Sequence, residues 1–188
     1  MSVSEFLQDE AEFARFVQIV RYEGIRSFLE IGSKFGGSLR RVALAMPAGS
    51  RVVSVDLPNG TRAWRDSEGS LNQTIKWLSG TGYDAHLIWG NSQDAVVVER
   101  VRRLGPFDAV FIDADHRLPG VTADWKNYGG MASKLVAFHD IGWRRADTWV
   151  GTRIDVPEFW SSIKDGFQHE EIKLCPTGKN NGIGVLWV

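Results

Sequence analysis

Hydrophobic positions along the chain follow two periods, and each change of period predicts a new element. Near the N-terminus, apolar residues recur every three or four positions, which predicts a helix within residues 1–24. Short apolar runs then alternate with segments of helical spacing: SFLEIG, RVVSVDL, DAHLIWG, FDAVFIDAD and KLVAFHDIG. Such continuous runs are typical of buried parallel strands. Strand and helix alternate five times, which predicts one parallel sheet wrapped by helices on both faces.

The end of the chain breaks this alternation. FQHEEIKLC and NGIGVLWV have the pattern of two strands joined by a turn rich in Pro, Gly and Asn. We therefore expect an antiparallel hairpin at one edge of a mostly parallel sheet. A chain of 188 residues is long enough for one well-packed domain. The predicted fold class is α/β, a single Rossmann-like, doubly wound domain over 1–188, with an N-terminal helix (1–24) before the core (25–188).

Polar side chains gather where the predicted strands end. They are Glu30, Asp56, Asn91, Asp113, Asp115, His116, His139 and Asp140. In doubly wound folds, ligands bind in the crevice at the carboxyl ends of the strands. We therefore expect the functional site along this edge, with Asp115 more typical of a turn or cap than of a ligand.

The stretch FLEIGSKFGGSL places a carboxylate and three glycines between the first strand and its helix. Its spacing, E-x-G-x-x-x-G-G, differs from the G-x-G-x-x-G of dinucleotide-binding folds. Glu30 would oppose an anionic pyrophosphate and would favour a cationic or N–H-bearing ligand. Asp56, after the second strand, is placed to accept hydrogen bonds from ribose hydroxyls. S-adenosylmethionine fits both features, because it joins a nucleoside to a sulfonium and an amino acid.

Composition and charge narrow the classes of partner. The net charge of -1 provides no basic field for nucleic acid or a membrane surface, and no apolar run approaches the length of a membrane span. The single cysteine, Cys175, excludes a disulfide within the chain. The polar, acidic N-terminus is unlike a secretory signal. These features predict a cytoplasmic protein with a small-molecule partner, and they leave the oligomeric state, including a homodimer, open.

Five stretches, in their order along the chain, carry a family resemblance: FLEIGSKFGGSL, RVVSVDL, LIWGNSQD, FDAVFIDADH and LVAFHDI. Together they resemble class I S-adenosylmethionine-dependent methyltransferases, over nearly all of the chain after the first helix. Within that superfamily the chain is similar to metal-dependent O-methyltransferases of sugars and natural products. The resemblance implies methyl transfer from S-adenosyl-L-methionine to a hydroxylated small-molecule acceptor.

The resemblance also assigns residues to the cofactor. Those implied to bind it are Glu30, Gly32, Gly36, Asp56, Asn91, Ser92 and Asp113. The glutamate and the glycines line the amino-acid end, Asp56 holds the ribose, and the pair after the third strand borders the adenine. From the pattern alone, Ser92 is also expected to be the N-cap of the following helix.

A metal site and a base are implied in the same way. The metal-dependent branch places ligands at the ends of the fourth and fifth strands, which here are Asp113, His139 and Asp140. Relatives carry a base three residues after the first aspartate, here His116, so that His116 and Asp113 are the implied catalytic residues. Magnesium prefers oxygen ligands, and a histidine ligand shifts the preference toward manganese, iron or zinc. Alternatively, only Asp140 of the pair is a ligand and His139 lies nearby or serves as the base.

Three other interpretations stay open at this level. A metal-independent methyltransferase would use Asp113 and Asp140 to hydrogen-bond its acceptor. A nicotinamide-dependent oxidoreductase is disfavoured by the glycine spacing and by the absence of a Tyr-x-x-x-Lys pair. A catalytically silent nucleoside-binding module is disfavoured by Asp113, His116 and Asp140 occurring together.

Two polar loops, 58–69 and 142–156, are expected to overhang the site. They carry Trp64, Trp143 and Trp149, which could close over a ring-shaped acceptor and exclude water.

Overall fold

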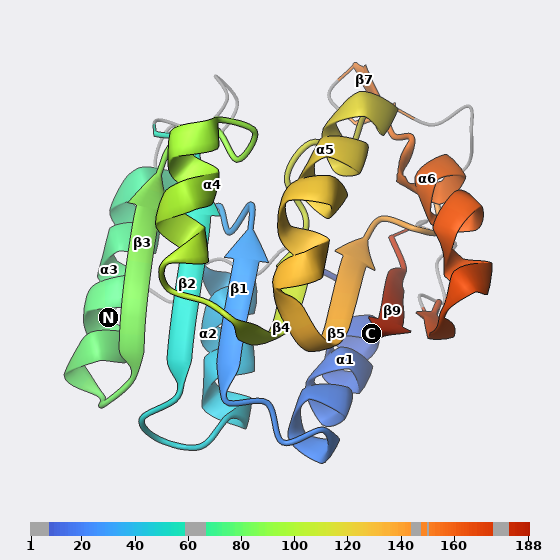
Figure 1. Cartoon of the computed structure of the whole chain (residues 1–188). Coiled ribbons are helices and arrows are strands. Elements are labelled where there is room, and N and C mark those ends of the chain that lie inside the picture. Colours follow the sequence, from blue (N-terminus) through green and yellow to red (C-terminus); the bar gives the residue numbers. More distant parts are fainter. Residues whose placement is uncertain (1–7, 59–66, 144–147, 150, 175–180) are drawn as a thin grey trace.

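The computed structural model describes residues 8–58, 67–143, 148–149, 151–174 and 181–188. One seven-stranded sheet forms its centre, in the order β3-β2-β1-β4-β5-β9-β8 (Figure 1). The strands are β1 (Ser27–Ile31), β2 (Arg51–Asp56), β3 (Asp84–Trp89), β4 (Phe107–Ile112), β5 (Ala132–His139), β8 (Gln168–Ile172) and β9 (Ile183–Trp187). The first five strands run parallel, whereas β9 pairs antiparallel with β5 and β8. The predicted α/β fold class, including the antiparallel pair at one edge, is confirmed.

Helices cover both faces of this sheet (Figure 1). One face carries α1 (Glu10–Tyr22), α2 (Gly37–Ala45) and α3 (Ser67–Gly80), and the other carries α4 (Ala95–Arg102), α5 (Leu118–Tyr128) and α6 (Val156–Ile163). Short 3-10 turns, η1 (Gly129–Met131) and η2 (Lys164–Gly166), follow α5 and α6, and a separate two-stranded pair is formed by β6 (Thr148–Trp149) and β7 (Thr152–Arg153). Among the described helices, none has the length and apolar character that a membrane crossing requires.

Alternate residues of the parallel strands belong to two hydrophobic cores, one on each face of the sheet, because successive side chains of a strand point to opposite faces. Leu29 packs on the side of α4 to α6, and its neighbour Phe28 packs on the side of α1 to α3. Phe111 of β4 meets Phe13 and Phe16 of α1, with ring centroids 6.2 and 5.3 Å away. Burial on both faces explains the continuous apolar runs of the sequence.

The register of the central strands brings their carboxyl ends to one level. β1 and β4 are neighbours at the point where the strand order reverses, and Ile31 pairs there with Ile112. On the other side of β4, Ile112 pairs with Phe138 of β5. The residues that directly follow these strands therefore share the edge at which doubly wound folds bind ligands.

Two helix starts differ from the sequence interpretation. Within the described part of residues 1–24, α1 begins at Glu10 with Asp9 as its N-cap. The α4 helix begins at Ala95, so Ser92 is not its N-cap and that prediction is wrong. The physical reason is that the Ser92 hydroxyl already donates to a buried carboxylate on another helix.

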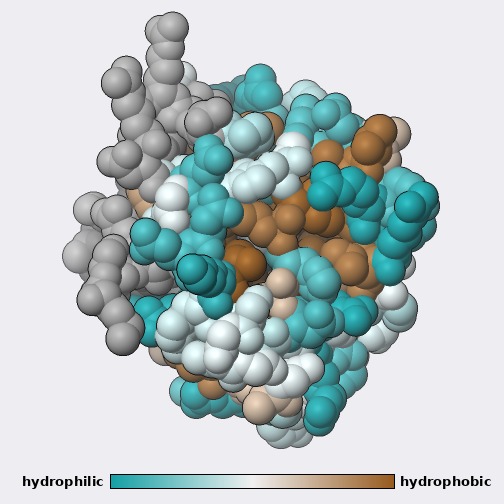
Figure 2. Space-filling model, turned by 90° about the vertical axis from the view of Figure 1, so that its left-hand side faces the viewer, coloured by the Kyte–Doolittle hydropathy of each residue, from teal (hydrophilic) through white to brown (hydrophobic). Residues whose placement is uncertain are grey.

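β3 forms one edge of the sheet, and Figure 2 looks onto this edge, where hydrophobic residues gather in the middle of the view. A depression of about 260 Å³ is lined there by His86, Leu87, Ile88, Arg100, Arg103 and Leu104. β3 has one buried residue, whereas β1 is buried over four of its five. The strand at this edge is therefore less buried than the centre of the sheet.

Candidate active site

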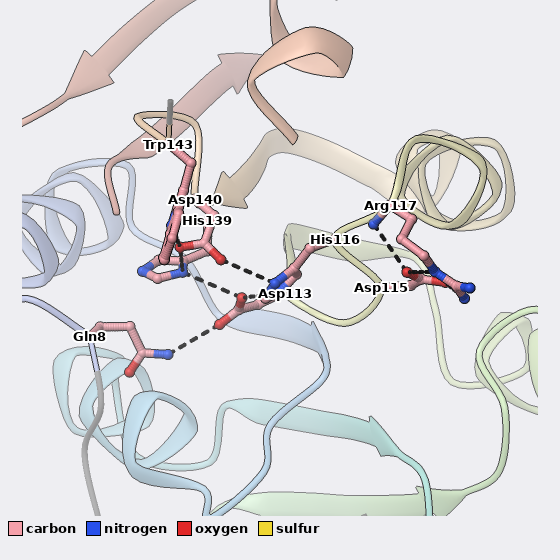
Figure 3. Close-up of polar contacts among 8 residues, drawn as sticks. All are labelled: Gln8, Asp113, Asp115, His116, Arg117, His139, Asp140 and Trp143. Atoms are coloured by element: carbon pink, nitrogen blue, oxygen red, sulfur yellow. Dashed lines mark hydrogen bonds and ion pairs between the residues drawn. The ribbon is translucent and has the colours of Figure 1, made fainter. Parts of the chain in front are cut away.

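Four side chains meet at the carboxyl ends of β4 and β5 (Figure 3). Asp113 directly follows β4, His139 is the last residue of β5, and Asp140 comes next. His116 belongs to the loop between β4 and α5. We call Asp113, His116, His139 and Asp140 the Asp–His cluster. The structure thus brings together the residues that the sequence assigned to the metal and the base.

Within the cluster, each imidazole contacts both aspartates. His116 Nδ1 lies 3.2 Å from Asp140 Oδ2, and His116 Nε2 lies 3.3 Å from Asp113 Oδ1. His139 Nδ1 lies 3.0 Å from Asp140 Oδ1 and 3.4 Å from Asp113 Oδ1. Asp140 has a φ of 65°, a left-handed conformation that is uncommon outside glycine and that clusters at functional sites.

These contacts decide the charges of the cluster. Burial disfavours the ionised carboxylate of Asp113, but His139 and His116 outweigh it and hold the pKa of Asp113 below its usual range. Burial also disfavours an imidazolium at His139 and at His116, yet the facing aspartates raise the pKa of both histidines. Asp113 and the two histidines therefore favour one another's charged forms.

Three further residues donate hydrogen bonds to residues of the cluster. The indole Nε1 of Trp143 donates to Asp140 Oδ1 at 2.8 Å, and the Gln8 amide donates to Asp113 Oδ2 at 3.2 Å (Figure 3). The backbone N–H of Asp155, just before α6, donates to the carbonyl oxygen of His116 at 2.7 Å. The neighbouring Asp115 instead pairs with Arg117 and points away from the cluster.

The donor set of the cluster suits a cation. Asp113, His139 and Asp140 each offer one ligand atom, and these atoms lie within 4.8 Å of one another. His139 Nε2 is buried with no hydrogen-bond partner in the described part of the chain. Carboxylate oxygen and imidazole nitrogen together are ligands for first-row divalent metals.

Gly32 connects the end of β1 to this cluster. Its φ is 90°, and a Cβ at this position would lie 2.3 Å from the carbonyl oxygen of Asp113. The Asp113 N–H donates to the Ile31 carbonyl at 2.9 Å, which keeps the two loops in contact. Gly36 also has a positive φ, and a Cβ there would lie 3.0 Å from the Thr74 side chain. Both glycines are thus required by close packing, independently of any ligand.

Glu30, within β1, is fully buried, and neither carboxylate oxygen has a hydrogen-bond partner among the described residues. Burial raises the pKa of Glu30 to about 8, against the opposing effect of the nearby Ser38 and Ser33. At neutral pH the carboxyl group is therefore mostly protonated. Ser38, the buried second residue of α2, was not singled out from the sequence, although it directly follows the glycine pair.

Asp56, the last residue of β2, holds the loop between β1 and α2 through a hydrogen bond from Lys34. Its carboxylate accepts hydrogen bonds from the backbone N–H groups of Lys34 and Leu57, the latter at 2.7 Å. Burial raises the pKa of Asp56, and these N–H groups counteract it. A carboxylate offers about four acceptor positions, so two N–H partners leave room for hydroxyl donors.

The two residues after β3 differ in their surroundings. Asn91 is exposed, and its side chain accepts from the Gln93 N–H at 3.0 Å. Ser92 is buried, with its hydroxyl donating to Asp124 at 2.7 Å and its carbonyl accepting from the Tyr128 hydroxyl at 2.6 Å. Asp124 and Tyr128, four residues apart on α5, were missed because their partner lies on another element.

Some residues discussed from the sequence lie outside the described part of the structure: Trp64, Cys175 and the side chain of Trp149. Trp143 is described, and its bond to Asp140 places one indole of the second loop beside the cluster.

The chain matches one family of known proteins and resembles several solved structures. A family model described as a methyltransferase domain matches residues 29–141, more than half of the chain, from β1 to just beyond Asp140. No curated protein sequence matches the chain. Among solved structures, the chain is similar to the O-methyltransferase from Bacillus cereus in complex with SAH, with a TM-score of 0.72 and 16% identity over 99% of this chain and 84% of that one.

Two further solved structures share the fold. TomG from Streptomyces achromogenes, an O-methyltransferase involved in tomaymycin synthesis and solved with SAM, has a TM-score of 0.68 and 16% identity over 97% of this chain and 82% of its own. Cofactor-bound Rv0187 from MTB has a TM-score of 0.73 and 17% identity over 100% and 84%. The family match argues against the oxidoreductase and the silent binding module. The chain belongs to the methyltransferase domain family, and the protein is a methyltransferase of the class I fold.

Proposed function

We propose that this methyltransferase moves the methyl group of S-adenosylmethionine to a hydroxyl of a small-molecule acceptor, with a divalent cation at the Asp–His cluster. One observation carries the proposal: two carboxylates and two imidazoles meet beside Gly32 at the carboxyl ends of β1, β4 and β5. This is the edge at which a doubly wound sheet binds its ligands.

The half of this edge formed by β1 and β2 supports the cofactor assignment. Glu30 has a buried carboxyl group without partners, which a cationic amino-acid end would ionise and pair. Asp56 keeps acceptor positions for ribose hydroxyls. Of the pair proposed for the adenine, Asn91 is exposed, whereas Ser92 is buried with its hydroxyl bonded to Asp124 and its carbonyl to Tyr128. The similar structures from Bacillus cereus and Streptomyces achromogenes hold SAH and SAM, respectively.

The half formed by β4 and β5 supports the cation and the acceptor. Asp113, His139 and Asp140 are the residues that would hold the cation. The imidazole nitrogen in this set favours manganese over magnesium, which prefers oxygen ligands in octahedral geometry. A divalent cation bound there would lower the pKa of an adjacent hydroxyl.

His116 is proposed as the proton acceptor. Its side chain is 23% exposed, more than that of the other three cluster residues, so an acceptor can reach it. A divalent cation bound beside His116 would disfavour its imidazolium form and leave the imidazole neutral and able to take a proton. The acceptor oxygen would then bond to the methyl carbon as the carbon–sulfur bond breaks, with the electron pair left on sulfur and the hydroxyl proton passing to His116. Asp113 and Asp140 stabilise the imidazolium that results.

A second candidate function follows from the same cluster. Each histidine contacts both aspartates, so two imidazolium groups would balance the two carboxylates without a metal. A metal-independent methyltransferase would then use the aspartates to hydrogen-bond the acceptor.

Turnover separates these candidates. The protein is incubated with S-adenosylmethionine and a panel of sugars and vicinal-diol natural products, and methylated products are detected by mass. We expect a chelator to abolish turnover while calorimetric binding of S-adenosylhomocysteine survives. Full turnover after exhaustive chelation would remove the cation and support the second candidate. Absence of binding heat with both cofactor forms would contradict the cofactor assignment.

A further inference from the structure

Gln8 is a polar residue that no motif of the sequence singles out. It directly precedes Asp9, the N-cap of α1, yet its side-chain amide reaches across the fold to Asp113. The amide Nε2 lies 3.2 Å from Asp113 Oδ2, and Gln8 is partly buried (Figure 3). The chain entering α1 thus supplies a wall of the Asp–His cluster.

The position of Gln8 is fixed by contacts that do not involve the cluster. Glu12 is 2% exposed, and its carboxylate accepts from the backbone N–H groups of Leu174 and Gly182, both at 2.9 Å. Arg15 forms a bidentate pair with Glu170 at 2.8 and 2.9 Å. These contacts hold α1 against the C-terminal strands, so the helix does not depend on the Gln8–Asp113 bond for its place.

The bond has a specific consequence for Asp113. It occupies Oδ2, whereas Oδ1 is the oxygen that faces His116 at 3.3 Å and His139 at 3.4 Å. A carboxylate can turn about its last side-chain bond, and an amide donor on one oxygen limits that rotation. Carboxylates that bind metals are commonly held by such an outer hydrogen bond.

We propose that Gln8 is a positioning residue, which fixes the Asp113 carboxylate so that Oδ1 is presented to the cation and to His116. The inference rests on the proposed cation site. It makes Gln8 part of the active site rather than part of the scaffold alone. A merely structural role would predict a change in thermal stability without a change in cation affinity.

The test compares Gln8→Met, which keeps the length of the side chain and removes the donor, with the control Arg15→Met. The control breaks an exposed pair of the same helix and leaves Asp113 untouched. Manganese binding is measured by calorimetry on both variants and the wild type, with S-adenosylhomocysteine affinity and melting temperature recorded alongside. We expect Gln8→Met to weaken manganese binding by about 10- to 100-fold. The control should bind manganese like the wild type, and saturating manganese should restore most of the kcat of Gln8→Met.

The outcomes are distinguishable. Equal manganese affinity in Gln8→Met and the wild type overturns the positioning role and leaves the cation site standing. Equal losses in both variants also overturn it, because they would trace the effect to the docking of α1. A wild-type protein that binds no manganese, magnesium or zinc overturns the cation site together with this inference, while S-adenosylhomocysteine binding reports separately on the cofactor half.

Discussion

The pKa values of the buried carboxylates are shifted in opposite directions in the two halves of the candidate site. At the ends of β1 and β2, which we call the cofactor half, burial raises the pKa of Glu30 and Asp56. Backbone N–H groups donate to Asp56, whereas neither carboxylate oxygen of Glu30 has a hydrogen-bond partner among the described residues. At the ends of β4 and β5, the acceptor half, His139 and His116 outweigh burial and lower the pKa of Asp113.

The difference lies in the partners of the carboxylates. In the acceptor half, two imidazoles contact the aspartates directly. In the cofactor half, Glu30 has no such partner among the described residues, and a cation from outside the chain would favour its ionised form. A cationic methyl donor on one side and a proton transfer on the other would account for both environments, and variants of single residues can separate them.

The largest expected effect concerns the acceptor half. His116→Ala should lower kcat by about 10²–10⁴-fold, because the proton of the acceptor loses its base. Binding of S-adenosylhomocysteine, measured by calorimetry, should stay unchanged. His86→Ala is the control, since that histidine pairs with Asp84 on β3 at 2.7 Å, away from the cluster. Wild-type kcat in the His116 variant would move the base to His139 or remove it from the mechanism.

Gly32→Ala should affect both halves at once. The new Cβ would approach the Asp113 carbonyl within 2.3 Å at a φ of 90°, and we expect a loss of on the order of 3 kcal/mol in the free energy of unfolding. Urea unfolding measures it. Gly24→Ala is the matched control, because Gly24 has a φ of 61° with nothing within 4 Å of a Cβ. Similar losses at the two positions would show that the approach to Asp113 contributes nothing beyond backbone strain.

Glu30→Gln tests the cofactor half through pH. The pKa of Glu30 rises from 4.5 to about 8 in the folded protein, so between these values the folded state keeps a proton that the unfolded state has lost. Wild-type stability from this group therefore falls as pH rises through that window. The variant does not titrate, and its advantage should grow with pH, to on the order of 3 kcal/mol at pH 7. A stability difference that is constant from pH 5 to 8 would contradict the raised pKa.

The smallest effect is expected at Asp56. Asp56→Ala should weaken S-adenosylmethionine binding by about 1–3 kcal/mol, because ribose hydroxyls lose their acceptor. Calorimetry measures the affinity, and kcat at saturating cofactor should change little. Asp108→Ala serves as the control, since its carboxylate holds the Arg26 and Ser27 N–H groups at the opposite end of β1. Unchanged affinity in the Asp56 variant would assign this residue to the glycine loop alone.

The sequence predicted the strands and the cluster for a definable reason. A strand buried on both faces is a nearly continuous apolar run. Asp113 and His139-Asp140 can therefore be identified in the sequence as the first polar residues after such runs. Parallel pairing of β4 with β5 then brings them together without further information. Gly32 follows from the same logic, because a polar strand end followed by glycine marks a tight turn.

Other parts of the site depend on contacts between distant segments, which no local pattern reveals. Gln8 is a polar residue near an exposed helix start, and only the packing of α1 on Phe111 brings it to Asp113. Ser92 has the pattern of an N-cap, but burial beside α5 gives its hydroxyl a better-placed partner in Asp124.

The two backbone bonds accepted by Glu12 also set an order of assembly during synthesis. Their donors, Leu174 and Gly182, are translated more than 160 residues after the glutamate that they bind. A nascent chain that already contains β1 to β5 and all four cluster residues therefore still lacks the anchor of its first helix. We expect such a chain, released before residue 174, to hold α1 less firmly, because it retains the packing on Phe111 but lacks both N–H groups that bond Glu12.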